Sequence, residues 1–238
     1  MQVVLMAGGQ GTRLRPYTAV LPKPLVPIGE ISIIEMVLRQ LKHYEFEDIV
    51  ISVGYKAELI MAVVGDGNRF GLKVRYQQED EPLGTLGALT QIPDLDDNFL
   101  VMNGDICTDL SFSEIYNNHC CSSALATVGT YCRREKIELG VVNLDKRQNF
   151  ITGFQEKPVN EYHVSMGVNA FNRAVIKQIP VGEFFGFDML LLKLLKHKIP
   201  IHSYLFNGQW LDIGRPDDYD RMYQLFQKKP GAFLPPGA

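Results

Sequence analysis

The length, composition and charge of the chain limit its fold and its partners. Its 238 residues suffice for one large α/β domain, and a hydrophobic fraction of 46% is ordinary for a protein with a full-sized core. The 24 Lys and Arg residues nearly balance the 27 Asp and Glu residues, which gives a net charge of −3. This balance argues against the basic surface that nucleic acids and anionic membranes attract, so we expect neither as a partner.

The cysteines and the hydropathy pattern bear on the compartment. Cys107, Cys120, Cys121 and Cys132 form no C-x-x-C pair and have no histidine at zinc spacing, so we expect reduced thiols. The chain starts with a strand-like run, not with the charged segment and long apolar stretch of a signal peptide. No apolar run approaches the ~20 residues of a membrane span. These features predict a soluble, cytoplasmic protein.

Strands and helices are expected to alternate along the first hundred residues. Short apolar runs rich in β-branched residues predict buried strands over 1–7, 48–53, 72–77 and 98–102. Apolar residues that recur on one face, or a glycine that opens a turn, predict helices over 33–43, 57–65 and 84–91. Between the first strand and the first helix, four prolines forbid a regular helix and predict an extended loop: Pro16, Pro22, Pro24 and Pro27.

This alternation is typical of βαβ units, which build a Rossmann-like, mainly parallel sheet flanked by helices, an α/β fold. In such sheets ligands bind beyond the carboxyl ends of the strands. Gly8-Gly9 follows the first strand, and Asn103-Gly104-Asp105 follows the fourth. The coincidence of the two motifs at strand ends is the first indication of a functional site.

The pattern changes after residue 120, where strand-like segments follow one another at 124–132, 139–144, 153–155 and 164–172. We expect them to form a smaller antiparallel excursion that covers the site of a second ligand. A helix over 187–196, a strand over 201–206 and a helix over 216–227 complete a single predicted domain of residues 1–229. The Pro- and Gly-rich residues 230–238 are expected to form a mobile tail.

Glycines dominate the turn after the first strand. Gly8, Gly9 and Gly11 let the backbone turn sharply and approach a phosphate without a Cβ atom in the way. The third glycine of the dinucleotide fingerprint G-x-G-x-x-G is missing, and the chain has no P-loop motif. Arg13 follows the loop directly, and Lys23 lies between two prolines that restrict the backbone beside it. The segment predicts an anion site with two placed cations.

The stretches from Leu5 to Thr18 and from Pro22 to Ile28 resemble the signature of the sugar-phosphate nucleotidylyltransferases, also called nucleotide-sugar pyrophosphorylases. Members of this family transfer a nucleotidyl group from a nucleoside triphosphate to a sugar 1-phosphate and release pyrophosphate. The resemblance implies that Arg13 steadies the leaving pyrophosphate and that Lys23 contacts the phosphates at the reacting centre. It also implies that the triphosphate is wrapped by the loop residues Ala7, Gly8, Gly9, Gly11 and Thr12.

Two aspartates stand beside glycines at separate points of the chain: Asp105 in Asn103-Gly104-Asp105, and Asp212 in Trp210-Leu211-Asp212-Ile213-Gly214. A carboxylate pair, together with phosphate oxygens and water, makes an oxygen-rich site suited to Mg²⁺. Both match the metal-binding aspartates of the family. The resemblance therefore implies Mg²⁺ as the cofactor, held by Asp105 and Asp212.

Further segments extend the resemblance to the base and the sugar. Residues 81–89 resemble the family segment that holds the base and the ribose, which implies nucleotide contacts at Gly84 and Thr85. Residues 154–158 match the family pattern F-x-E-K-P, which implies that Glu156 binds sugar hydroxyls and that Lys157 neutralises the sugar phosphate. Gly140 resembles the glycine whose backbone lies against the sugar.

Two positions depart from the family pattern. Ser165 stands where an asparagine near the sugar is common, so it is expected at the sugar site, and Arg215 stands where a threonine is usual. Neither change removes a charge that the chemistry needs. Both leave the identity of the sugar open.

The nucleotide is indicated by residues 77–85, which are most like those of guanylyltransferases acting on mannose or heptose phosphates. Glu79 can accept hydrogen bonds from guanine N1–H and the exocyclic amine, a donor pair that pyrimidines lack. Uridylyl, thymidylyl and cytidylyl transfer remain alternatives. A non-catalytic regulatory subunit that binds a nucleotide sugar is another alternative. The presence of all four charged residues expected at the reacting centre argues against it: Arg13, Lys23, Asp105 and Asp212. A homodimer is the assembly that the family resemblance implies.

Overall fold

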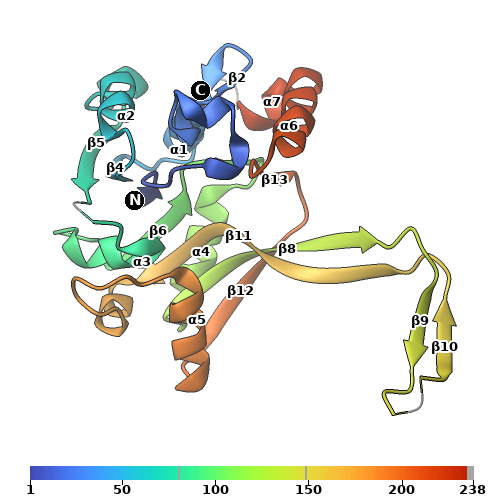
Figure 1. Cartoon of the computed structure of the whole chain (residues 1–238). Helices are drawn as coiled ribbons and strands as arrows, with labels where there is room; N and C mark the ends of the chain where they lie inside the picture. The colour runs from blue at the N-terminus through green and yellow to red at the C-terminus, as the bar shows by residue number, and fades with distance from the viewer. Residues whose placement is uncertain (80, 148, 235–238) are drawn as a thin grey trace.

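Seven strands form one twisted central sheet in this computed structural model, which describes residues 1–79, 81–147 and 149–234 (Figure 1). Their order is β12-β8-β11-β6-β1-β4-β5. Four neighbours run parallel: β6 (Asn98–Asn103), β1 (Gln2–Met6), β4 (Asp48–Val53) and β5 (Lys73–Gln78). The other three are β8 (Ala126–Lys136), β11 (Val159–Asn172), which runs antiparallel to both its neighbours, and β12 (Ile201–Phe206). The expected Rossmann-like, mainly parallel sheet is confirmed.

Helices cover both faces of this sheet because strand side chains alternate between them. Within β1, Val3 and Leu5 pack on one side with α1 (Ile33–His43), α2 (Ala57–Val64) and α4 (Phe112–Cys121). Val4 packs on the other side with α3 (Gly84–Gly87), the 3₁₀ turn Ala88–Gln91 and α5 (Phe187–Lys196). Each face is therefore closed by its own apolar core. No helix in the described ranges has the length and hydropathy needed to cross a bilayer.

The proline-rich segment between β1 and α1 is less extended than expected. It contains the 3₁₀ turns Thr12–Leu14, Tyr17–Ala19 and Lys23–Leu25, followed by the two-residue strands β2 (Pro27–Ile28) and β3 (Ile31–Ser32). Proline fits the first turn of a helix, where its missing N–H leaves no hydrogen bond unmade, so short turns survive where a regular helix cannot.

The C-terminal segment packs on the end of the molecule beside this loop. α6 (Pro216–Lys228) and α7 (Pro230–Phe233) share an apolar cluster with Leu14, Val26 and Ile28. Phe233 is fully buried. The first residues of the expected mobile tail thus form a packed helix, because one aromatic side chain anchors them, and residues 235–238 lie outside the described ranges.

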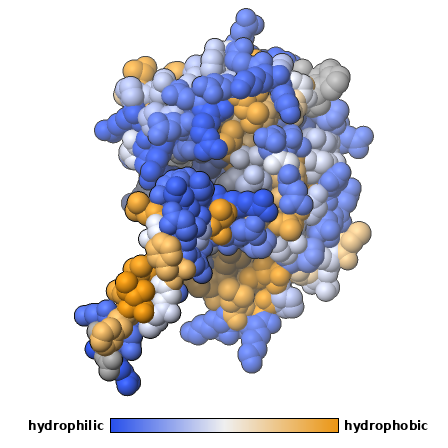
Figure 2. Space-filling model, turned by 90° about the vertical axis from the view of Figure 1, so that its right-hand side faces the viewer, coloured by the Kyte–Doolittle hydropathy of each residue, from blue (hydrophilic) through white to orange (hydrophobic). Residues whose placement is uncertain are grey.

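A long arm leaves the sheet on the side of β8 and β11. β12 accompanies β8 only as far as Tyr131, and beyond that point β8 and β11 continue as a two-stranded ribbon. A bend leads to the hairpin of β9 (Val141–Leu144) and β10 (Ile151–Gln155). We call residues 132–164 the arm. The expected antiparallel excursion is present, but the arm extends away from the body, as Figure 1 and the side view in Figure 2 show.

Candidate active site

The glycine loop begins where β1 ends, between the ends of its two parallel neighbours. The Ala7 amide donates to the Ser52 carbonyl at 2.8 Å, and the Gly104 amide donates to the Met6 carbonyl at 2.9 Å. Gly11 has φ +59°, and a Cβ atom there would lie 3.1 Å from both Lys23 Cβ and Thr18 Cγ2. The Thr18 hydroxyl donates to the Gly11 carbonyl at 2.8 Å. Glycine is therefore favoured at position 11 by its left-handed conformation, and the tight packing disfavours any side chain there.

A cleft of about 710 Å³ lies over this loop, at the carboxyl ends of the parallel strands. Most of the residues predicted from the sequence line it: Ala7, Gly8, Gly9, Gly11, Thr12, Arg13, Lys23, Glu79, Gly84, Thr85 and Asp105. Space is open above Gly9, because a Cβ atom there would meet no atom of the described chain within 4 Å. The loop backbone is thus accessible to a ligand in the cleft.

The two predicted metal-binding aspartates come together through a short strand pair that the motifs did not reveal. β7 (Ile106–Thr108) starts directly after Asp105, and β13 (Trp210–Asp212) pairs with it antiparallel, with Asp212 opposite Ile106. Two carboxylates more than a hundred residues apart in sequence therefore stand close together. Asp105 lines the cleft, whereas Asp212 is not among the lining residues and lies beside Lys23, which is.

Lys23 bridges these two carboxylates. Its Nζ lies 2.5 Å from Asp105 Oδ2 and 3.5 Å from Asp212 Oδ1, and the residue is only 8% exposed. The other oxygen, Asp105 Oδ1, is buried and has no hydrogen-bond partner in the described structure. Such an acceptor leaves the pair with capacity for a further cation.

The donor set fits Mg²⁺, which prefers one or two carboxylates and completes its shell with water and substrate phosphates. Within the described residues, no third histidine, cysteine, aspartate or glutamate joins the pair in a larger ligand cluster.

Cys107, two residues after Asp105, is fully buried, and its burial raises the pKa of its thiol well above the ordinary value. The Asp105 charge raises this pKa further, and Lys23 partly offsets the effect.

Arg13 and Trp210 flank the carboxylates. A Cβ atom on Gly214 would lie 3.8 Å from Arg13 Cζ and 3.7 Å from Asp212 Oδ2, so the guanidinium stands near the second aspartate. Trp210 Nε1 donates to the Met166 carbonyl at 3.0 Å, and its ring lies 5.5 Å from that of Tyr131. Trp210 therefore ties the strand that carries Asp212 to the base of the arm.

Glu79 lines the cleft, and its carboxylate also accepts two hydrogen bonds from the chain itself. Oε1 accepts from the Ser52 hydroxyl at 2.7 Å, and Oε2 accepts from the Leu83 amide at 3.0 Å. These bonds anchor the segment that leads into α3. Each carboxylate oxygen has a second lone pair, so the bonds orient Glu79 without exhausting its capacity.

The segment Gly84–Gly87 is held by a loop a hundred residues later. The Leu86 and Gly87 amides donate to the Phe185 carbonyl at 3.0 and 3.1 Å, and the Phe187 amide donates to Thr85 Oγ1 at 2.9 Å. The neighbouring Phe184 lines the cleft. Its place there depends on this long-range contact, for which the local sequence carries no signal.

Two further residues of the cleft could have been predicted, because ligands of parallel sheets bind at the carboxyl ends of the strands. Gly54 and Tyr55 follow β4 as the glycine loop follows β1, and their lining role could be predicted from the strand-end rule. The remaining additions adjoin predicted motifs: Met6, Gln10, Pro24, Pro82 and Asn103.

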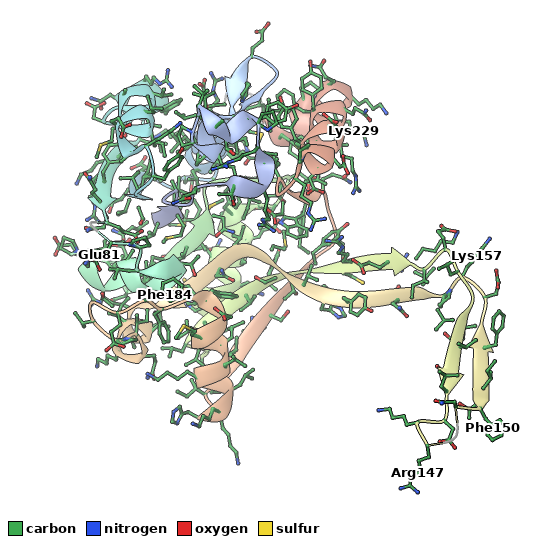
Figure 3. The ribbon with its side chains drawn as sticks, in the orientation of Figure 1. Glu81, Arg147, Phe150, Lys157, Phe184 and Lys229 are labelled. Carbon is green, nitrogen blue, oxygen red and sulfur yellow. The ribbon has the colours of Figure 1, made fainter. Side chains whose placement is uncertain are left out.

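The four residues assigned to the sugar phosphate lie elsewhere within the described chain, and none of them lines the cleft. Gly140, Glu156 and Lys157 are on the arm, and Ser165 is at its base, beside a register shift of β11. Figure 3 shows Lys157 at the bend of the arm, far from Phe184 at the cleft. The sequence motifs do not predict this separation.

The structure nevertheless brings two of the four together. A Cβ atom on Gly140 would lie 3.3 Å from Glu156 Oε2 and within 3 Å of the Phe154 ring, so a larger residue there would displace the ring. Lys157 has φ +45°, a left-handed conformation that is uncommon for a non-glycine residue. The bend is a specific local structure, with an exposed carboxylate and an exposed ammonium at adjacent positions.

Comparisons with known proteins agree with this fold and these motifs. A protein from Synechocystis, described as UTP–glucose-1-phosphate uridylyltransferase, is 33% identical over an alignment of 240 positions that covers 92% of this chain. The chain spans 61% of that relative's length. A D-glycero-alpha-D-manno-heptose 1-phosphate guanylyltransferase from Campylobacter jejuni is 29% identical, with 92% of this chain and 97% of the relative covered. The crystal structure of HddC from Yersinia pseudotuberculosis matches with a TM-score of 0.73 at 24% identity, covering 94% and 99% of the two chains.

A family model extends the agreement to nearly the whole chain. The model described as Nucleotidyl transferase matches residues 2–229, which include the glycine loop, both aspartates and the arm. The match confirms the family that the glycine loop and its two cations resemble. The chain belongs to the nucleotidyl transferase family.

Proposed function

We propose that this chain transfers a nucleotidyl group from a nucleoside triphosphate to a sugar 1-phosphate, with release of pyrophosphate. One observation carries the proposal: the Lys23 ammonium pairs with the carboxylates of Asp105 and Asp212, and Lys23 and Asp105 line the same cleft as the glycine loop. Such a cluster brings placed charges to an open phosphate site. Phosphoryl chemistry depends on this kind of positioning and charge neutralisation more than on proton transfer.

The chain's own residues provide the required steps. A sugar 1-phosphate oxygen is ionised at neutral pH, so it can attack the α-phosphorus in line without a general base. The new bond joins this oxygen to the α-phosphorus, and the bond to the bridging oxygen of pyrophosphate breaks. Lys23 neutralises charge at the reacting phosphates, and Arg13 holds the departing pyrophosphate. Mg²⁺ bound by Asp105 and Asp212 would supply further charge neutralisation between the two anions.

We further propose GTP and a mannose- or heptose-type 1-phosphate as the substrates. Support comes from the likeness of residues 77–85 to guanylyltransferases and from the heptose-specific relative. Glu79 lines the cleft and is oriented by Ser52 and Leu83, as a group that selects a base needs to be. The uridylyl activity named for the Synechocystis relative makes UTP the principal competitor.

Binding of the sugar phosphate is assigned to Gly140, Glu156, Lys157 and Ser165. The contact between Gly140 and Glu156 supports a joint role for these residues. Because the bend of the arm stands away from the cleft, the assignment requires that it approach a cleft during the reaction.

Pyrophosphate release tests the proposal. The full chain is incubated with each of four nucleoside triphosphates, with mannose, heptose or glucose 1-phosphate, and with Mg²⁺. We expect the fastest release with GTP. Lys23→Met should abolish release, whereas Lys177→Met, at an exposed lysine that does not line the cleft, should not. Tight binding of a nucleotide sugar with no release from any combination would instead establish a regulatory subunit.

A further inference from the structure

One aromatic side chain of the cleft wall is exposed instead of packed in the core. Phe184 lines the cleft together with Glu79, Gly84 and Thr85, and it is 63% exposed. Figure 3 shows it beside α3. The next residue, Phe185, is only 6% exposed and packs in the apolar core on this face of the sheet. Phe185 therefore anchors the loop, and Phe184 presents an aromatic ring to the cleft.

The backbone on either side of this ring is fixed by hydrogen bonds to the segment that contains α3. The Phe185 amide donates to the Leu83 carbonyl at 2.8 Å, and the Phe185 carbonyl accepts from the Leu86 and Gly87 amides. The loop thus holds Phe184 in place without a ligand. A side chain that is already positioned loses little conformational freedom when it binds one.

Two glycines of α3 make room for the loop. A Cβ atom on Gly84 would lie 2.9 Å from the Phe185 carbonyl oxygen and 3.1 Å from Phe184 Cε2. A Cβ atom on Gly87 would lie 2.8 Å from the Glu183 carbonyl oxygen. Gly84 also has φ +76°, a left-handed conformation that glycine adopts without strain. The Phe184 ring can therefore lie close against the backbone of the cleft wall.

Leu83 connects this loop to the carboxylate proposed to select the base. Its amide donates to Glu79 Oε2 at 3.0 Å, and its carbonyl accepts from the Phe185 amide. The two polar groups of one residue thus position Glu79 and the neighbour of Phe184. Proteins that bind a nucleobase use both hydrogen bonds at its edge and aromatic contact with its face. Glu79 and Phe184 supply one group of each kind.

The face of the Phe184 ring is available to a ligand. Among the described residues that line the cleft, Tyr55 and Phe184 are the ones with aromatic rings. The Lys56 ammonium lies 5.2 Å from the centroid of the Tyr55 ring, so that ring already has a partner. Within the ranges that the structure describes, Phe184 has neither a ring–ring nor a cation–π partner.

We propose that the Phe184 ring stacks on the base of the nucleoside triphosphate, an inference that rests on the nucleotidyl transfer proposed above. Stacking strengthens with the area of overlap, so the two fused rings of a purine gain more from it than the single ring of a pyrimidine. Phe184 therefore selects the base by its size, whereas Glu79 selects it by the donors at its edge. The two criteria together favour guanine.

Calorimetry of the full chain with Mg²⁺ measures the contribution of the ring. The ligands are GTP, ATP, UTP, CTP and tripolyphosphate, each added alone. Phe184→Ala should weaken the binding of GTP and ATP by roughly tenfold or more and that of UTP and CTP by a smaller factor. The affinity for tripolyphosphate, which has no base, should stay unchanged. Phe184→Tyr keeps the ring and should bind purines as wild type does. Phe150→Ala removes an equally exposed ring on the arm and is the matched control.

Phe184→Trp provides a direct optical readout. A stacked base quenches the fluorescence of an indole, so GTP should quench this variant strongly. Wild type contains Trp210 as its single tryptophan, and its response to GTP gives the background. Quenching no larger than in wild type would contradict stacking.

Two results of the calorimetry would overturn the inference. Phe184→Ala could bind GTP as tightly as wild type, or it could lose the same factor for all five ligands, in which case the ring only supports the cleft. Both results leave the proposed function standing when wild type releases pyrophosphate. A wild type that binds no triphosphate and releases no pyrophosphate would refute the proposed function and the stacking role together.

Discussion

At the scale of single residues, Lys23 reduces the repulsion between two carboxylates even when no ligand is bound. Its ammonium lies within ion-pair distance of two carboxylates that would otherwise repel each other. A lysine is well suited to this place, because its long stem can pack beneath the glycine loop while its single charge faces both aspartates. The residue thus has a structural role beside the chemical role proposed above.

Lys23→Met should therefore destabilise the ligand-free protein. Removal of one member leaves the Asp105 and Asp212 carboxylates uncompensated, and we expect a loss of roughly 2 kcal/mol, below the value for full burial because Asp212 is partly exposed. Added Mg²⁺ or Mn²⁺ should recover part of this loss. Urea unfolding with and without the cation measures both effects, and Lys23→Met/Asp105→Asn should lose less than Lys23→Met. A variant as stable as wild type would refute the charge argument.

Glu79→Gln tests the selection of the base. A neutral amide cannot accept from both guanine donors, so we expect the ratio of kcat/KM for GTP to that for UTP to fall by roughly tenfold or more. Ser52→Ala removes the hydroxyl that orients Glu79 but keeps the carboxylate, and should change this ratio less. Equal effects of the two substitutions would mean that Glu79 acts only by holding the cleft.

At the scale of secondary-structure elements, α4 is attached to β8 through a buried histidine. His119 Nδ1 lies 2.8 Å from Thr127 Oγ1, and the residue is 2% exposed. Burial lowers the pKa of His119 below its ordinary value of about 6.5, and the nearby His202 lowers it further. The folded state therefore prefers the neutral ring.

The sign of the resulting pH dependence follows directly. Below about pH 6.5 the unfolded chain takes up a proton that folded His119 does not, so the free energy of unfolding falls as the pH falls. The contribution of neutral His119 to the free energy of unfolding is fully present above this pH. His119→Gln should be less stable at neutral pH but should lose less between about pH 7 and pH 5 than wild type does. Urea unfolding across this range checks the difference in slope, and parallel curves would contradict the assignment.

Most elements of the fold follow from local patterns. The helices α1 and α5 and the strands β4 and β12 begin and end where their apolar patterns predict, because each contributes apolar side chains to the core. α4 was not expected from its weak apolar pattern. Its start carries the capping sequence Ser111-x-x-Glu114, and the Ser111 side chain accepts from the Glu114 amide at 3.3 Å, a signal that could have located it.

Some residues of the candidate site could likewise be predicted from the sequence, and others could not. Residues in one glycine loop can be predicted to share a ligand because they are neighbours in sequence. The convergence of Asp105 with Asp212 depends on the pairing of β7 with β13, and Phe184 reaches the cleft through backbone contacts across a hundred residues. Strands of three residues carry too little periodicity to be predicted from composition.

At the scale of the whole molecule, the chain separates its two proposed substrates. The body holds the cleft proposed for the nucleotide, and the arm carries three of the four residues assigned to the sugar phosphate, with Ser165 at its base (Figure 3). The two functions should then respond independently to substitution.

Lys157→Met tests this separation. The loss of a cation that pairs with a phosphate should raise the KM for the sugar 1-phosphate by roughly tenfold, while the affinity for the nucleoside triphosphate alone stays unchanged. Lys146→Met, at an exposed lysine of the same arm, is the matched control. Steady-state kinetics and calorimetry of the triphosphate provide the two readouts. An unchanged KM for the sugar phosphate would remove Lys157 from the site.

The hydrogen bond from Trp210 to the Met166 carbonyl gives the arm a mechanical connection to the cleft. Met166 lies within the register shift of β11, directly beyond the base of the arm, and the Trp210 indole that bonds to it belongs to the strand that ends in Asp212. A change in the direction of the arm that shifts Met166 would therefore change the hydrogen bond that holds Trp210. A molecule bound at the far end of the arm would thus affect the position of the Asp212 carboxylate.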